Sequence, residues 1–138
     1  MSRGFLLDTC AVIWITRNDP VDPAAAEAMS EAYDEGRPVC ISPVTAWELG
    51  MLTARRKIAE TKPVEVWYEE FCATRGLMEL PLTTDILIRS SFLPGPVHND
   101  PFDRILIATA REKDLTIVTR DKAILAYGAA GHVHVLAC

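Results

Sequence analysis

The sequence HNDPFDRILIATA, residues 98–110, joins a strong helix start to a long apolar helix. Asp100 suits the N-cap position, because its carboxylate can accept backbone N–H groups that have no partner within a helix. Pro101 suits the first helical position, where a missing N–H costs nothing. Asp103 falls in the first turn, near the positive end of the helix dipole. The apolar run from Ile105 to Ala110 predicts a helix that is buried on more than one side.

Short apolar runs alternate with helical segments on both sides of this stretch. The runs expected to form buried strands are Phe5–Leu7, Pro38–Ile41, a segment within Met78–Leu82, Leu115–Val118 and Val133–Leu136. The other expected helices are Thr9–Ile15, Ala24 to about Glu35, Val44 to about Lys57, Val64–Arg75, Thr84 to about Phe92, and Lys122–Tyr127. This alternation predicts an α/β fold, with a parallel sheet covered by helices on both faces.

Three local patterns predict how these helices pack and end. Val44, Trp47 and Met51 follow helical spacing and are expected to face the core. Gly128 is expected to end the last helix as its C′ residue. The basic triplet Arg55-Arg56-Lys57 has two interpretations: it complements the negative end of a helix dipole, or it contacts phosphate or an acidic partner.

Length, composition and charge limit the classes of protein that fit. The chain has 138 residues and a net charge of −5, which favours a single domain over residues 1–138 and argues against an overall basic nucleic-acid surface. We find neither an export signal nor an apolar run of about 18 residues, and therefore expect a soluble, cytoplasmic protein without membrane contact. His132 and His134 are expected to be structural. Reduced core thiols are expected at Cys10, Cys40, Cys72 and Cys138.

Four acidic residues are expected at one edge of the sheet. Asp8 follows the first strand and Asp121 the fourth. Glu48 and Asp103 lie on helices that can reach the same edge. Carboxylates in one pocket repel one another unless a cation offsets the repulsion, and oxygen ligands favour Mg²⁺ or Mn²⁺, which can activate water for phosphodiester hydrolysis. Each acid also has a structural interpretation, as a helix cap or first-turn acid or, for Glu48, as a solvated carboxylate.

Four motifs that contain these acids occur in a fixed order along the chain. They are LLDT at residues 6–9, SPVTAWE at 42–48, HNDPFDR at 98–104 and VTRD at 118–121. Together they resemble the four motifs of PIN-domain proteins, and specifically those of the VapC-type toxins of bacterial toxin–antitoxin pairs. The resemblance extends over essentially the whole chain.

The resemblance implies a three-layer α/β/α fold with a five-stranded, mostly parallel sheet. It implies an endoribonuclease toxin that uses Mg²⁺ or Mn²⁺, and its catalytic and metal-binding acids correspond to Asp8, Glu48, Asp103 and Asp121. Thr119 and Thr9 match supporting hydroxyl groups of the family. The implied partners are RNA, a cognate antitoxin and a second copy of the chain, and any contact to DNA would be made by the antitoxin.

The third motif leaves two assignments open. Asp100 and Asp103 lie in one helical turn, so both can face the same pocket. The family pattern, in which the metal-site acid is followed one turn later by Ile107-Ala108, favours Asp103 for that role and Asp100 as a cap or outer group. Arg104 forms either a structural ion pair or a contact to substrate phosphate. His98 is expected to lie in a loop.

Two other classes of function are alternatives to the nuclease. A receiver-type phosphoacceptor domain also places acids, a threonine and Mg²⁺ at strand ends, but the chain lacks an early Asp-Asp pair and a late Thr…Lys set. A non-catalytic PIN-like scaffold is the second alternative, and the presence of all four acids argues against it.

Overall fold

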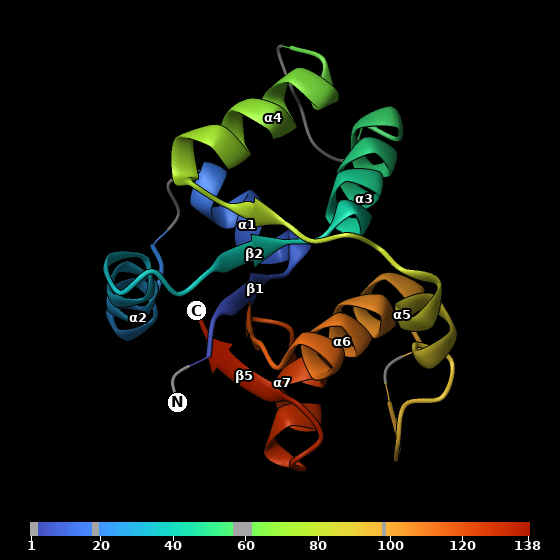
Figure 1. Cartoon of the computed structure of the whole chain (residues 1–138). Coiled ribbons are helices and arrows are strands. Elements are labelled where there is room, and N and C mark those ends of the chain that lie inside the picture. Colours follow the sequence, from blue (N-terminus) through green and yellow to red (C-terminus); the bar gives the residue numbers. More distant parts are fainter. Residues whose placement is uncertain (1–2, 18–19, 57–61, 98) are drawn as a thin grey trace.

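The computed structural model describes residues 3–17, 20–56, 62–97 and 99–138 (Figure 1). In chain order the elements are β1 (Phe5–Leu7), α1 (Thr9–Thr16), α2 (Pro23–Asp34), β2 (Val39–Ile41), α3 (Pro43–Ala54), α4 (Val64–Arg75), β3 (Met78–Glu79), α5 (Thr84–Arg89), α6 (Pro101–Lys113), β4 (Thr116–Thr119), α7 (Lys122–Ala129) and β5 (His134–Ala137). The predicted loop residue His98 and the predicted helix end at Lys57 lie outside the described residues. None of the helices in these ranges has the length and apolar character needed to cross a membrane.

The sheet has the strand order β3-β2-β1-β4-β5, and its described strand pairs are parallel. The central strand β1 pairs on both sides, with Phe5 opposite Val39 of β2 and opposite Thr116 of β4. Parallel neighbours need crossover connections, which place helices over the faces of the sheet. The structure thus confirms the α/β fold, its five strands and the three layers that the resemblance implied (Figure 1).

Each face of the sheet packs into its own hydrophobic cluster. Leu6 of β1 and Ile117 of β4 face the cluster that α5, α6 and α7 complete. The next residues along these strands, Leu7 and Val118, face the cluster of α1, α2 and α4. This alternation follows from the pleat of the strands, whose successive side chains point to opposite faces. Figure 1 shows the two helical layers on either side of the strands.

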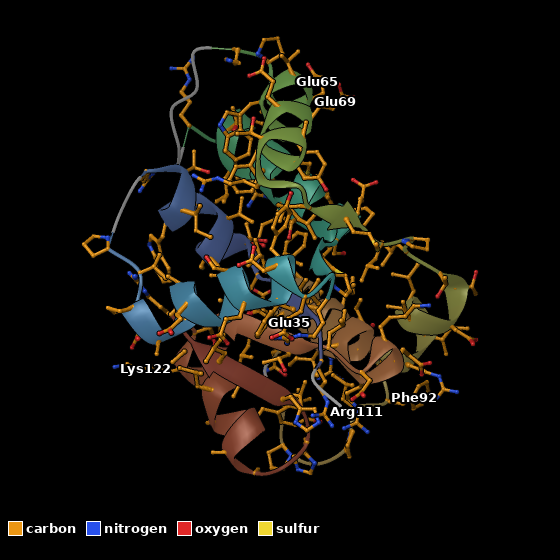
Figure 2. All side chains as sticks on the ribbon, turned by 60° about the vertical axis from the view of Figure 1, so that its left-hand side comes forward. Glu35, Glu65, Glu69, Phe92, Arg111 and Lys122 are labelled. Carbon is orange, nitrogen blue, oxygen red and sulfur yellow. The ribbon has the colours of Figure 1, made fainter. Side chains whose placement is uncertain are left out.

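Three of the helices start as their sequences predict. Asp22, Ser42 and Asp100 each accept a backbone N–H group from the first turn of the helix that follows. Each is followed by a proline at the first helical position, whose fixed φ suits a helix start. Charged side chains cover the outer sides of the helices, as Glu65 and Glu69 do on α4 (Figure 2).

Two residues expected in the core are exposed. Trp47 keeps 56% of its surface exposed, so its prediction as a core residue is wrong. Val44 and Leu49 are the residues of α3 that fill the core, and they lie in different clusters. Cys10 is also exposed, because α1 turns Ala11 and Val12 towards the core instead. Of the other free cysteines, Cys40 is buried as predicted, whereas Cys72 and Cys138 are half-buried.

Helix ends differ from the predictions at several places. The helix α5 ends at Arg89, before the expected Phe92, and the Ser90 hydroxyl donates to the Leu87 carbonyl oxygen where it stops. The helix α3 ends at Ala54, which leaves Arg55 and Arg56 exposed beyond it.

Gly128 does not end α7, which continues through it to Ala129. A Cβ atom at this position would clash with the side chain of Val135 on β5. The glycine therefore serves close packing between helix and strand, and its prediction as a C′ residue is wrong. His132 packs against the ring of Tyr127, with ring centroids 4.7 Å apart, which agrees with a structural role.

Candidate active site

Asp8 is held rigidly at the carboxyl end of β1. Its backbone N–H donates to the Val118 carbonyl oxygen of the neighbouring strand. One carboxylate oxygen accepts the N–H of Ala11 at 2.7 Å and so caps α1, and the other accepts the hydroxyl of Thr119. The side chain is only 2% exposed. Contacts from β1, α1 and β4 therefore fix the orientation of this buried carboxylate.

Thr119, the last residue of β4, connects two of the predicted acids. Its hydroxyl donates to Asp8 and accepts the backbone N–H of Asp121 at 2.9 Å. Asp121 in turn accepts the Ile124 N–H at 2.9 Å and caps α7. The structural interpretation of Asp121 as a cap is therefore confirmed, and the same contacts bring it close to Asp8. The supporting hydroxyl predicted at Thr119 lies between the two acids.

Glu48 and Asp103 approach Asp8 and Asp121 from two packed helices. The helix α3 carries Glu48 and packs against α6, which carries Asp103 in its first turn. Burial and the negative charge of Asp100 raise the pKa of Glu48, and a hydrogen bond from Thr9 partly opposes them. The Thr9 hydroxyl also forms a hydrogen bond with the Thr45 hydroxyl of α3 at 3.1 Å, so the predicted supporting residue joins α1 to α3.

The four acids affect one another electrostatically. Burial raises the pKa of Asp8 to about 6; the charges of Asp121 and Glu48 add to this, while hydrogen bonds from Thr119 and Ala11 oppose it. The pKa of Asp103 rises to about 7 through burial and through the charges of Asp100 and the other acids of the site. Such mutual repulsion requires that the four side chains lie within electrostatic range of one another. The structure thus places all four predicted acids in one electrostatically coupled group.

The donor set fits a hard divalent cation. Within the described ranges, no three acidic, histidine or cysteine side chains are arranged as a complete metal-ligand group. Mg²⁺ often binds through one or two carboxylates and keeps several waters, so it does not need such a group. Burial is the largest cause of the raised pKa values of Asp8 and Asp103, and neighbouring negative charge adds to it; a cation placed among these carboxylates would oppose both effects.

The remaining predicted site residues have structural contacts. Asp100 caps α6 by accepting the N–H groups of Phe102 at 2.8 Å and Asp103 at 3.4 Å. Arg104 donates from Nε to the Ser90 carbonyl oxygen at 2.8 Å, which attaches α6 to the end of α5. That contact favours an anchoring role for Arg104, and a phosphate contact for this residue stays a prediction.

Cys10 is a neighbour of the acids that the sequence reasoning missed. Partial burial and the charges of all four acids raise the pKa of its thiol to about 12. The helical position two residues after Asp8 was the available signal. A second missed feature is the stacking of Arg120, between Thr119 and Asp121 in sequence, on Trp14 at 4.1 Å from the ring centroid.

Comparison with known proteins identifies the family. The model of the PIN domain matches residues 5–130. The chain is 31% identical over 123 residues to ribonuclease VapC22 of Mycobacterium tuberculosis, a match that covers 86% of this chain and 88% of that protein. The chain belongs to the VapC-type PIN-domain proteins.

Solved structures of VapC-type complexes share the fold of this VapC-type protein. VapBC2 from Rickettsia felis, solved bound to a DNA fragment from its promoter, matches with a TM-score of 0.71 and 13% identity over 98% of both chains. VapBC-5 from Mycobacterium tuberculosis matches with a TM-score of 0.61 and 19% identity, over 99% of this chain and 100% of that chain.

Proposed function

We propose that this VapC-type toxin hydrolyses RNA phosphodiester bonds with Mg²⁺ or Mn²⁺ held by Asp8, Glu48, Asp103 and Asp121. The observation that carries the proposal is the convergence of these carboxylates from four separate parts of the chain, with raised pKa values at Asp8 and Asp103. Ionised carboxylates in one pocket are costly unless they bind a cation. The name of the relative VapC22, a ribonuclease, supports RNA as the substrate.

The residues of the chain have distinct parts in this proposal. Thr119 and the N–H of Ala11 fix both oxygens of Asp8, and the rigid start of α6 fixes Asp103. Thr9 orients Glu48 through its hydroxyl. A bound Mg²⁺ or Mn²⁺ would lower the pKa of a water and neutralise charge on the phosphate. Positions held in this way need little rearrangement when the substrate binds, which favours rapid reaction.

The same comparisons support the expected partners. VapBC-5 is a member of the VapBC family of toxin–antitoxin systems, and VapBC2 was solved on promoter DNA. We therefore propose a cognate antitoxin for this chain and DNA contact through the antitoxin only. A homodimeric toxin is proposed from the family resemblance alone. The net charge of −5 agrees with a toxin that does not bind DNA itself. Residues 1–138 would act as one PIN domain in the cytoplasm, where its RNA targets are found.

The receiver-type alternative does not fit the observed sheet. The sheet of this chain has the strand order 3-2-1-4-5, whereas receiver-type sheets have the order 2-1-3-4-5. Calorimetric titration with Mn²⁺ tests the scaffold alternative, because a PIN domain that has lost its site should bind the ion feebly.

Substitution of Asp8 by Asn tests the proposal directly. Asparagine retains the shape and the capping ability of Asp8 but removes the charge that would hold the ion. We expect Asp8→Asn to abolish growth arrest in cells that lack the antitoxin, and to reduce RNA cleavage by about a thousandfold or more. Circular dichroism should show an unchanged fold.

The matched control is Asp85→Asn, which changes an exposed acid in the first turn of α5. It should remain as toxic as the parent chain. Full toxicity of Asp8→Asn would show that the proposed site is wrong.

A further inference from the structure

Trp47 presents a large aromatic surface to solvent next to the candidate active site. Its side chain is 56% exposed. Its ring contacts that of Phe102 edge-on, with centroids 4.7 Å apart and planes at 70°. Phe102 is itself packed against the core, so the ring of Trp47 rests on a side chain that is anchored in the protein. A tryptophan ring with more than half of its surface exposed is well suited to bind a partner.

The other two tryptophans use their ring faces within the protein. The guanidinium of Arg120 lies over the ring of Trp14, 4.1 Å from its centroid. The ring of Trp67 stacks on Phe71, with centroids 5.5 Å apart and planes at 11°. Trp47 differs from both, since its contact is edge-on and more than half of its surface remains exposed.

The position of this aromatic pair connects it to the acids. Trp47 immediately precedes Glu48 on α3, and Phe102 immediately precedes Asp103 on α6. The two helices pack against each other, so the ring contact and the two carboxylates share one helix–helix junction.

The charge of the site explains why a stacking surface is needed. Four carboxylates repel the phosphates of an RNA strand, and a bound cation offsets this repulsion most strongly at the phosphate that it contacts. Stacking of a base on an aromatic ring needs no opposite charge and works with every base. It requires a base that is unpaired and unstacked, which single strands and loops provide.

We propose that Trp47, supported by Phe102, stacks an unpaired base beside the cleaved phosphate. The inference rests on the proposed RNA hydrolysis. It assigns Trp47 to substrate binding. The competing occupant of the surface is a second copy of the chain, since Ile88 of α5 is also exposed, as is Phe92 (Figure 2), which follows the end of that helix.

Fluorescence and binding measurements on the full chain test the proposal. Chains that carry Asp8→Asn leave the RNA intact, and a short single-stranded RNA of mixed sequence is the probe, with the same strand annealed to its complement as the comparison. We expect the single strand to quench tryptophan fluorescence, and Trp47→Ala to abolish the quenching. Trp47→Ala should weaken binding by about fivefold to a hundredfold, and Trp47→Tyr should restore most of it.

The matched control is Tyr33→Ala, which removes another exposed aromatic side chain, 64% exposed on α2. It should leave RNA binding unchanged. In chains with an intact Asp8, Trp47→Ala should raise KM for RNA more than it lowers kcat.

Two results would overturn the proposal. Unchanged RNA binding by Trp47→Ala would remove the stacking role. A fall in molar mass by light scattering, together with unchanged KM, would assign the surface to a second copy of the chain. If Asp8→Asn alone kept full cleavage activity, the proposed function would fail instead, while the quenching of Trp47 would still report on the stacking surface.

Discussion

The N-terminal ends of α2 and α6 are built from the same dipeptide but have different surroundings. Both begin with Asp-Pro, and the aspartate accepts an N–H two residues later at 2.8 Å in each case, Ala24 in α2 and Phe102 in α6. The next residue of α2 is Ala25, which is fully buried. The next residue of α6 is Asp103, which lies among other acids.

The comparison shows which residue is required to start the helix and which is present in addition to the cap. The helix α2 is capped in the same way without any acid in its first turn. Asp103 has a pKa raised to about 7, so ionising it in the folded protein is unfavourable. Asp103 thus lowers the stability of the fold when it is ionised, and the helix does not need it as a cap. Its presence therefore favours a catalytic role for the start of α6.

The largest expected difference between the two helix starts is in catalytic activity, when an aspartate at each is replaced by asparagine. We expect Asp103→Asn to lower the rate of RNA cleavage with Mn²⁺ by about a thousandfold or more, because an amide holds a divalent cation poorly. Asp22→Asn should leave the rate within about twofold, since asparagine caps as well as aspartate. Initial rates on a labelled RNA measure both variants, and equal losses would remove the distinction between the two ends.

The α6 end should also make folding stability depend on pH. The pKa values of Asp8 and Asp103 are raised to about 6 and about 7, so the folded chain binds protons that the unfolded chain releases above its ordinary carboxyl pKa. In EDTA the free energy of unfolding should therefore fall by about 2–4 kcal/mol between about pH 5 and about pH 8, the lower value allowing for solvent screening of the partly exposed Asp103.

Urea denaturation at the two pH values measures this effect. Asp103→Asn should reduce the pH dependence to the part that Asp8 contributes, whereas Asp22→Asn should leave it unchanged. Addition of Mn²⁺ at the higher pH should restore stability, since a ligand that binds the folded state stabilises it. A stability that rises with pH over this interval in EDTA would contradict the electrostatic account of the site.

The smallest expected effect concerns the two caps themselves. Asp22→Ala and Asp100→Ala each remove a cap, and each should lower the free energy of unfolding by about 1 kcal/mol. Asp100→Ala should keep RNA cleavage within about tenfold, because Asp100 acts through the start of α6. A loss as large as that of Asp103→Asn would place Asp100 in the metal site as well.

The start of α6 could be predicted because its signal is local. Asp100, Pro101 and Asp103 set the first turn through contacts within a few residues, and the structure has the predicted cap. The convergence of the acids could also be predicted, since parallel strands end at one edge of their sheet. Asp8 and Asp121 follow two such neighbouring strands, and the electrostatic coupling between them agrees with this.

Features that depend on which elements meet could not be read from the sequence. The exposure of Trp47 depends on how α3 rotates between the two hydrophobic clusters, which use Val44 and Leu49. Gly128 is explained only by the approach of Val135 on β5. Helical spacing alone does not distinguish a core position from one that borders a neighbouring helix.

The hydrogen bond from Thr119 to Asp8 joins residues 111 positions apart in the chain. A ribosome adds about 5–20 residues per second, so roughly 5–20 seconds separate the synthesis of these two residues. During that interval the nascent chain has Asp8 without the hydroxyl that orients it. Synthesis itself thus delays the assembly of the site, and an incomplete chain lacks the contact that orients Asp8 until Thr119 has been made.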